Sequence, residues 1–259
     1  MTFARRRYGR DNYLYLLAVG GDAALVDPGD ADAALALVGE QAVRPRWVLH
    51  THGHPDHTGG SDRLRKELGV TVLGHEADAE RFRPDVFVEA GADLELGTLR
   101  IHVHPAPGHT PGSVLYEWSG RLLTGDTLFW GGCGNCRHGG DVGRLAETFL
   151  GVFSSLDPSL EIHPGHDYAE ANLPFVLALE PSNRAAAGRY AAVRAARAGG
   201  IEPEATDLGE ERLVNPFLRA GTNGVREALE GLGRSAGSAR EAFAALRALR
   251  DDWSTGRSP

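Results

Sequence analysis

The chain has 259 residues, of which 42% are hydrophobic and 24% charged, so it can bury a sizeable core as one large domain or two smaller ones. Its formal net charge of −8 disfavours a general nucleic-acid surface. No window approaches the roughly 20 apolar residues of a membrane span, and the apolar run after Arg5-Arg6-Arg7 is too short for a signal peptide. We therefore expect a cytoplasmic protein with neither a nucleic-acid nor a membrane partner.

Up to Tyr168 the chain alternates short strand-like runs with loops and a few helical stretches. The hydrophobic pattern predicts a hairpin over 13–19 and 23–26, helices over 31–38 and 61–68, and further strands over 47–49, 99–103, 121–125 and 160–163. After Tyr168 it predicts alanine-rich helices over 169–179, 184–198, 225–232 and 239–253. We therefore expect an α/β domain over 1–168 and a helical domain over 169–259.

A dense polar cluster follows the predicted strand over 47–49. It reads Thr51-His52-Gly53-His54-Pro55-Asp56-His57. His52 and His54 are two residues apart, so an extended backbone points both side chains the same way, and Pro55 favours that extended state at His54. The adjacent Asp56 and His57 cannot join them on one ion without a turn. The spacing therefore indicates two neighbouring ions.

Further metal donors occur at places of the same local type. His109 lies in a Pro/Gly loop after the strand over 99–103, and Asp126 follows an apolar run that ends in glycine. His166 follows the last predicted strand and the pair Pro164-Gly165. With the first cluster these residues supply five imidazoles and two carboxylates. A donor set without thiolate suits zinc first, with iron or manganese as alternatives.

The motifs THGHPDH, PGHTPGS, TGDTLF and HPGHDY, in this order, resemble those of the metallo-β-lactamase superfamily. The resemblance implies an αββα sandwich with two divalent metal ions. One ion would be held by His52, His54, His109 and Asp126. The other would be held by Asp56, His57 and His166, with Asp126 bridging the two. A metal-bridging hydroxide would then attack a carbonyl in a hydrolysis, and we count Asp56 as catalytic as well as a ligand.

The rest of the chain resembles glyoxalase II, the hydroxyacylglutathione hydrolases. The resemblance lies in the segments Gly125–Phe129, Gly132–Gly134, His166–Tyr168, Asn215–Arg219 and Phe243–Arg247. It implies a thioester hydrolase that acts on a small-molecule glutathione thioester of the S-lactoylglutathione type, in methylglyoxal detoxification, as a monomer or small homo-oligomer. Tyr168 and Arg219 match positions at which that family contacts glutathione.

The chain departs from the family after Gly-Cys-Gly. The family usually places a basic residue and then an aromatic one there, whereas this chain has Asn135 and Arg137. Either Arg137 compensates from two residues away, or the thioester carries another acyl group or another thiol. The departure concerns the substrate and leaves the reaction unaffected.

A second enzyme class fits part of the same pattern. A persulfide dioxygenase of this fold needs one mononuclear iron held by two histidines and one carboxylate, which His52, His109 and Asp126 could supply. The long helical C-terminus favours the hydrolase. Cys133 and Cys136 form a CxxC that we interpret as two thiols in a glycine-rich loop. The remaining histidines are interpreted as structural: His50, His75, His102, His104, His138 and His163.

Overall fold

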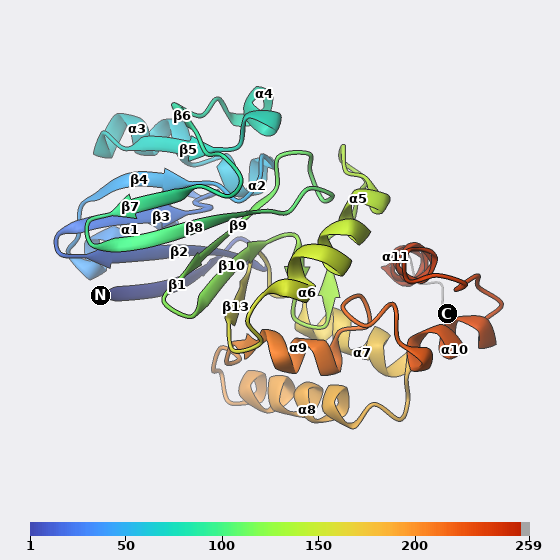
Figure 1. Cartoon of the computed structure of the whole chain (residues 1–259). Coiled ribbons are helices and arrows are strands. Elements are labelled where there is room, and N and C mark those ends of the chain that lie inside the picture. The colour runs from blue at the N-terminus through green and yellow to red at the C-terminus, as the bar shows by residue number, and fades with distance from the viewer. Residues whose placement is uncertain (255–259) are drawn as a thin grey trace.

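The structure, a computed structural model, describes residues 1–254. Two six-stranded sheets pack face to face, with helices on their outer sides (Figure 1). Helices α7 to α11 gather at one end of this sandwich. The predicted αββα fold with a helical C-terminal part is confirmed.

The first sheet is built from the N-terminal third of the chain, in the order β1-β2-β3-β4-β5-β6. Strands β1 to β3 are antiparallel, and β3 to β6 are parallel. The bounds are Thr2–Tyr8, Asn12–Val19, Asp22–Val26, Pro45–Leu49, Thr71–Gly74 and Val86–Phe87. The predicted hairpin is β2 and β3.

The second sheet has the order β14-β13-β10-β9-β8-β7. Strands β7 to β10 form an antiparallel meander, β13 lies parallel to β10, and β14 closes the edge. The bounds from β7 to β10, then β13 and β14, are Asp93–Leu96, Leu99–Pro105, Val114–Trp118, Arg121–Gly125, Glu161–Pro164 and Thr206–Asp207. A small hairpin of β11 and β12 (Leu128–Phe129, Gly132–Cys133) stands apart from both sheets.

Strand β2 shows why the sandwich forms. Its side chains alternate between two buried clusters, because successive residues of a strand point to opposite faces. Tyr13, Tyr15 and Leu17 enter the core between the sheets, and Leu14 and Leu16 enter the layer beneath the outer helices. A strand buried on both faces reads as one apolar run.

The helices of the first two-thirds of the chain are short. Several of them cover the outer faces of the sheets. From α1 to α6 their bounds are Ala31–Gln41, Pro55–Thr58, Ser61–Leu68, Ala79–Phe82, Val142–Glu147 and Phe153–Ser155, with a 3₁₀ turn over Glu76–Asp78 and a π-helical turn over Thr148–Val152. Helix α1 runs three residues past the predicted end and stops at Ala42, which is left-handed.

The C-terminal helices share one core with the sheets, because a single buried cluster contains Tyr15 and Val103 of the two sheets together with Phe175 and Phe243 of the C-terminal helices. The bounds from α7 to α11 are Ala169–Leu179, Arg184–Ala198, Leu208–Val214, Asn223–Gly231 and Ala239–Ser254. The four predicted helices all occur. The sequence pattern did not predict α9, which is short, or β1, whose arginines obscure its alternation. It also did not predict the strands β5, β7 and β9.

Candidate metal centre

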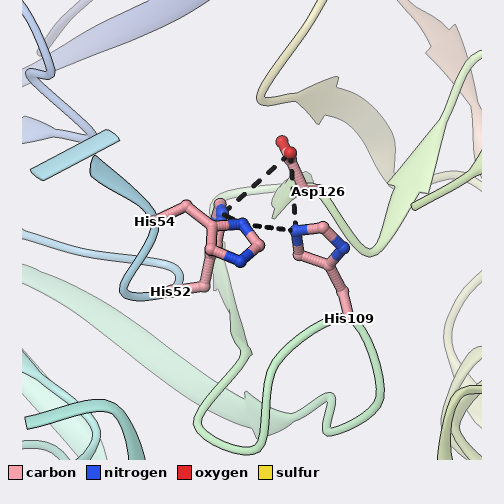
Figure 2. Close-up of side chains that lie close together, drawn as sticks. All are labelled: His52, His54, His109 and Asp126. Atoms are coloured by element: carbon pink, nitrogen blue, oxygen red, sulfur yellow. Dashed lines mark hydrogen bonds and ion pairs between the residues drawn. The ribbon is translucent and has the colours of Figure 1, made fainter. Parts of the chain in front are cut away.

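Four of the expected donors converge on one point. His52 and His54 follow β4, His109 lies in the loop between β8 and β9, and Asp126 follows β10. Their donor atoms all lie within 4.8 Å of one another, and Figure 2 shows the three rings and the carboxylate turned toward a common centre. His54 Nδ1 is 3.1 Å from His52 Nε2 and 2.9 Å from His109 Nε2. Asp126 Oδ2 is 3.6 Å from His109 Nε2.

The other three expected donors form a second group beside the first. His57 Nε2 and His166 Nε2 are 3.2 Å apart, and Asp56 Oδ2 is 3.3 Å from His166 Nε2. Asp126 reaches this group as well, because its Oδ1 is 3.3 Å from His57 Nε2 and its Oδ2 is 3.4 Å from His166 Nε2. One carboxylate therefore stands between two donor groups.

Local backbone geometry produces this division. His54 is extended (φ −72°, ψ 145°), as Pro55 requires, and caps helix α2 with Pro55 in its first turn. The helical turn swings Asp56 and His57 away from the preceding pair of imidazoles. His52 and His54, which precede Pro55, therefore lie in the first group. Asp56 and His57, which follow it, lie in the second.

The donor atoms fit divalent cations better than they fit one another. Four-coordinate zinc with nitrogen bonds of 2.0–2.1 Å would place its ligand nitrogens about 3.3 Å apart, close to the separations observed here. Asp126 Oδ1 is buried and accepts no hydrogen bond within the described chain. A buried carboxylate oxygen without a well-formed hydrogen bond is costly, and a cation held between this oxygen and His57 Nε2, 3.3 Å away, would satisfy it.

The electrostatics of the two groups differ. Burial holds the pKa of His52 well below its ordinary value and lowers that of His109 to about 4, so these rings are neutral and able to coordinate. For His57 and His166 burial also lowers the pKa, but Asp126 outweighs it and raises the values to about 10 and 11. Metal binding to these two rings would therefore have to displace protons from them.

Polar partners behind the rings orient them. Asp11 Oδ1 lies 2.8 Å from His166 Nδ1, and the Asn135 carbonyl lies 2.6 Å from His109 Nδ1. Asp27 Oδ2 lies 3.3 Å from His57 Nδ1. Such partners set the ring tautomer and orientation. The sequence analysis missed Asp11 and Asp27, and only the Asp27-Pro28-Gly29 turn after β3 signals a placed carboxylate.

Asp27 is the most constrained of these partners. Its backbone is left-handed (φ 50°), and its carboxylate accepts bonds from the Thr51 amide at 2.8 Å and the Thr51 hydroxyl at 2.6 Å. Burial raises the pKa of Asp27, but its hydrogen bonds to His50 and His57 outweigh burial and leave it lowered. Asp27 therefore stays ionised beneath the second donor group.

Two cavities that share lining residues open beside the donors, and we call them the metal arm and the arginine arm of one cleft. The metal arm, about 480 Å³, is lined by Pro55, Arg81 and His138 together with five of the seven donors: His54, Asp56, His109, Asp126 and His166. The arginine arm, about 320 Å³, is lined by Arg137, Arg247 and Arg250, with Asp251 also present. Asn135 and Tyr168 line both arms, and so form the neck between them.

The structure brings three of the four expected substrate contacts to the cleft: Tyr168, Asn135 and Arg137. The Tyr168 ring stacks on His166 at 4.8 Å with an interplanar angle of 7°. Arg219 is not brought there: it lines neither arm, and Glu180 holds its guanidinium in a bidentate pair. Arg247 and Arg250, which the sequence analysis did not single out as contacts, line the arm instead.

The arginine arm concentrates positive charge. Arg247 is 5% exposed, and its Nη1 donates to the Cys133 carbonyl at 2.8 Å. Arg250 donates to Asn172 Oδ1 at 3.0 Å. Burial and the nearby Arg247 lower the pKa of Arg250. Like charges held together in this way favour the binding of an anionic ligand.

The residues interpreted as structural lie outside the donor groups. None of the six other histidines belongs to a potential metal-binding group within residues 1–254; His50 packs on Phe82, and His163 packs on Phe3. Cys133 and Cys136 are free thiols, as expected. Burial raises their pKa values to about 11 and 12, so both are protonated at neutral pH.

Two family models together match almost the whole chain. One, described as the metallo-beta-lactamase superfamily, matches residues 7–166, and the other, described as the hydroxyacylglutathione hydrolase C-terminus, matches residues 167–253. A hydroxyacylglutathione hydrolase of Anaeromyxobacter dehalogenans is 63% identical over 254 residues, which are 97% of this chain and 99% of that protein.

Solved structures share the fold. ETHE1 from Myxococcus xanthus is 26% identical with a TM-score of 0.66, covering 96% of this chain and 98% of that one. TTHA1623, crystallised in a di-iron-bound form, is 25% identical with a TM-score of 0.63, covering 83% of this chain and 99% of that one.

The fold and the donor pattern define the class: the chain belongs to the metallo-β-lactamase superfamily. Within that superfamily it belongs to the hydroxyacylglutathione hydrolase family, because both the C-terminal model and the 63% identical relative match it. The expected resemblance to glyoxalase II is confirmed. Among the described residues, no helix is both long and apolar enough to cross a bilayer.

Proposed function

We propose that this chain hydrolyses the thioester bond of an acylglutathione, with S-lactoylglutathione as the type substrate. The observation that carries the proposal is the adjacency of two cavities that share Asn135 and Tyr168, one beside the metal donors and the other lined by three arginines. A thioester bound across the neck would place its carbonyl over the donors and its thiol portion among the arginines. The relative from Anaeromyxobacter dehalogenans, a hydroxyacylglutathione hydrolase by name, supports the same activity.

Two divalent cations are proposed for the seven donors, with zinc first and iron or manganese as alternatives. His52, His54, His109 and Asp126 would hold one. Asp56, His57, His166 and the shared Asp126 would hold the other. When bound, such ions lower the pKa of water and polarise a carbonyl oxygen. The di-iron form of TTHA1623 supports a two-metal site of this kind.

Asp56 serves the reaction from the mouth of the metal arm. Its Oδ2 faces His166 and accepts from Asn12 Nδ2 at 3.1 Å, while the side chain stays 52% exposed. Its Oδ1 makes no hydrogen bond within the described chain. That oxygen can accept the proton that the attacking water loses, as general base catalysis requires.

The arginine arm would hold the glutathione portion. Glutathione has two carboxylates and one ammonium group, so it is a net anion and suits guanidinium groups that bind carboxylates through paired N–H donors. Arg137, Arg247 and Arg250 supply those groups, and Arg137 thus takes over the anchoring that the family's usual basic residue provides. We do not assign this role to Arg219, because its guanidinium is paired with the Glu180 carboxylate.

The neck would hold the sulfur and the adjoining amide. Tyr168 packs flat on His166 and lines both arms. Burial raises the pKa of its hydroxyl, so the hydroxyl remains a hydrogen-bond donor. Asn135 offers its side-chain NH₂, since its Oδ1 already accepts from the Arg137 amide at 3.0 Å. Both residues can therefore orient the thioester without taking part in its cleavage.

Steady-state kinetics of Arg250→Gln test the proposal. We expect the KM for S-lactoylglutathione to rise at least tenfold with little change in kcat, because Arg250 would bind glutathione away from the reacting carbonyl. Arg240→Gln is the matched control: Arg240 lies on the same helix but pairs with exposed Glu147 outside the cleft. Absence of thiol release by the metal-loaded wild-type protein would refute the hydrolase.

The iron-dependent persulfide dioxygenase is the competing function. It needs only His52, His109 and Asp126, and so gives no reason for a complete second group of donors. Oxygen consumption with glutathione persulfide, measured beside thiol release from S-lactoylglutathione, separates the two. Oxygen uptake without thiol release would favour the dioxygenase.

The cytoplasm is proposed as the compartment. Free thiols at Cys133 and Cys136 suit a reducing environment, which is also where reduced glutathione is held. Fractionation of the native cells, followed by immunodetection of the chain, tests this.

A further inference from the structure

The metal arm of the cleft has a cationic wall that the proposed hydrolysis does not use. Arg81, from helix α4, lines this arm together with His138 and Pro55. If glutathione occupies the arginine arm and the carbonyl lies over the donors, the acyl group extends into the metal arm. The side chains around that group are then polar or charged, with Pro55 as the apolar exception.

Arg81 is held in place by its surroundings. Its Nη2 donates to the His138 carbonyl at 3.0 Å. The aliphatic part of Arg81 packs against Gly53, where an added Cβ would lie 2.8 Å from Arg81 Cδ. The Nη2 atom packs against Gly139, where an added Cβ would lie 2.5 Å from it. The glycine between the first two donor histidines therefore leaves room for this arginine.

The charge of Arg81 is poorly balanced. Its nearest carboxylate is that of Asp78, at 4.0 Å. That carboxylate already accepts from the Gly53 amide, the Thr110 hydroxyl and the Gly112 amide, at 2.8, 2.6 and 3.1 Å. Arg81 Nη1 makes no hydrogen bond within the described chain, and the side chain is 34% exposed.

A cation beside a centre that binds cations is electrostatically costly, because it weakens metal binding. The cost is offset when an anionic group binds between them. A guanidinium with free N–H donors suits a carboxylate best, through paired charge-assisted hydrogen bonds.

We propose that Arg81 binds a carboxylate on the acyl group, so that this chain prefers acylglutathiones whose short acyl chain ends in a carboxylate. The inference rests on the proposed thioester hydrolysis and names the substrate class of that site. Arg81 is thereby a specificity-determining residue, and the reacting carbonyl remains with the metal donors.

Binding of two stable thioethers tests the preference without turnover. S-(3-carboxypropyl)glutathione and S-(3-carbamoylpropyl)glutathione have the same length and differ in one charge. Calorimetry on the metal-loaded wild-type protein should show at least tenfold tighter binding of the carboxylate. Arg81→Gln should reduce that ratio to about one, and Arg81→Lys should retain part of it.

Arg83→Gln is the matched control, because Arg83 is an exposed cation two residues along the same segment and lines neither arm. It should keep the wild-type ratio. A wild-type ratio near one, or an Arg81→Gln ratio equal to that of the wild type, overturns the inference. The second result would mean that the metal ions alone bind the carboxylate.

The same measurements distinguish a failure of the proposed thioester hydrolysis from a failure of the proposed acyl preference. If neither thioether binds and S-lactoylglutathione is not hydrolysed, the proposed function fails and the inference fails with it. If both thioethers bind and S-lactoylglutathione is hydrolysed, but the carboxylate brings no gain, only the acyl preference is overturned.

Discussion

At the scale of single residues, Asp126 joins the two donor groups. Its oxygens lie 3.3 Å from His57 and 3.6 Å from His109, so one side chain reaches a member of each group. It lies on the turn after β10, at the end of a strand in the middle of the second sheet. A rigid strand end is a suitable place for a group shared by two ions.

Replacement of this carboxylate should disable both sites. We expect Asp126→Ala to lose both metal ions and all measurable thioesterase activity, because each site loses a ligand and the charge that balances its cations. Metal content by elemental analysis and thiol release give the measurements. Full activity with two retained ions would contradict the bridging role.

Gly165 gives a steric test of the same centre. A Cβ there would lie 2.3 Å from Asp126 Oδ1 and 2.7 Å from His57 Cε1, so Gly165→Ala must displace one of them. We expect at least a tenfold loss of kcat and weaker binding of the second ion, measured by competition with a chelator. Gly151→Ala is the control, because that position has open space. Equal metal affinity in Gly165→Ala and wild type would show that the site can adjust.

At the scale of elements, helix α9 connects the C-terminal part to the site. Glu211 on this helix is fully buried and accepts from the Gly131 amide at 2.9 Å. Asn215 donates to the Gly132 carbonyl at 2.9 Å. The helix thereby holds the β11–β12 hairpin, whose Cys133 carbonyl in turn accepts from Arg247 in the arginine arm.

Glu211 should make stability depend on pH. Burial raises its pKa from 4.5 to about 7, against the lowering effect of the Gly131 amide. As the pH rises, Glu211 therefore loses its proton at a higher pH in the folded state than in the unfolded state. Its contribution to the free energy of unfolding is full below pH 4.5 and is lost as the pH rises to about 7. The loss is on the order of 3 kcal/mol.

Glu211→Gln imitates the protonated carboxyl, and its free energy of unfolding should fall less than that of the wild type between pH 5 and pH 8. Urea denaturation of both proteins at the two pH values measures this, and the contribution of the shared metal site cancels in the difference. Identical pH slopes would show that Glu211 is ionised in the folded state throughout.

At the scale of the whole molecule, the donors join the two sheets. His52 and His54 follow β4 of the first sheet, whereas His109, Asp126 and His166 follow β8, β10 and β13 of the second. Bound ions would therefore link the two halves of the sandwich at one end, and binding to the folded state stabilises it by mass action.

Removal of the metal should lower the melting temperature. At a free metal concentration a thousandfold above Kd the stabilisation is about 4 kcal/mol, which in a chain of this size corresponds to about 10 °C. Scanning calorimetry with and without a chelator measures the shift. Asp126→Ala should respond little, and an equally large shift in that variant would mean that the chelator acts elsewhere.

Much of the molecule could be predicted from short segments of the chain. The hairpin, the strands that precede each donor and the long C-terminal helices follow from hydrophobic period, because each is defined by neighbouring residues. The seven expected donors were proposed from motifs that follow strands and from the resemblance that these motifs carry, and the structure brings them into two neighbouring groups. The edge strand β1 and the short helix α9 were missed because charged residues hide their pattern.

Contacts between distant segments required the folded chain. Nothing near Arg219 in the sequence indicates that Glu180 engages it, and nothing near Arg250 or Arg81 indicates that each lines the cleft. Asp11 and Asp27 support His166 and His57 across long separations in the chain, as hydrogen bonds in space. The sequence by itself therefore indicated the metal centre, because the expected ligands lie in short motifs. Only the packing of the sheets and helices decided which arginine side chains line the cleft, because those contacts join distant segments.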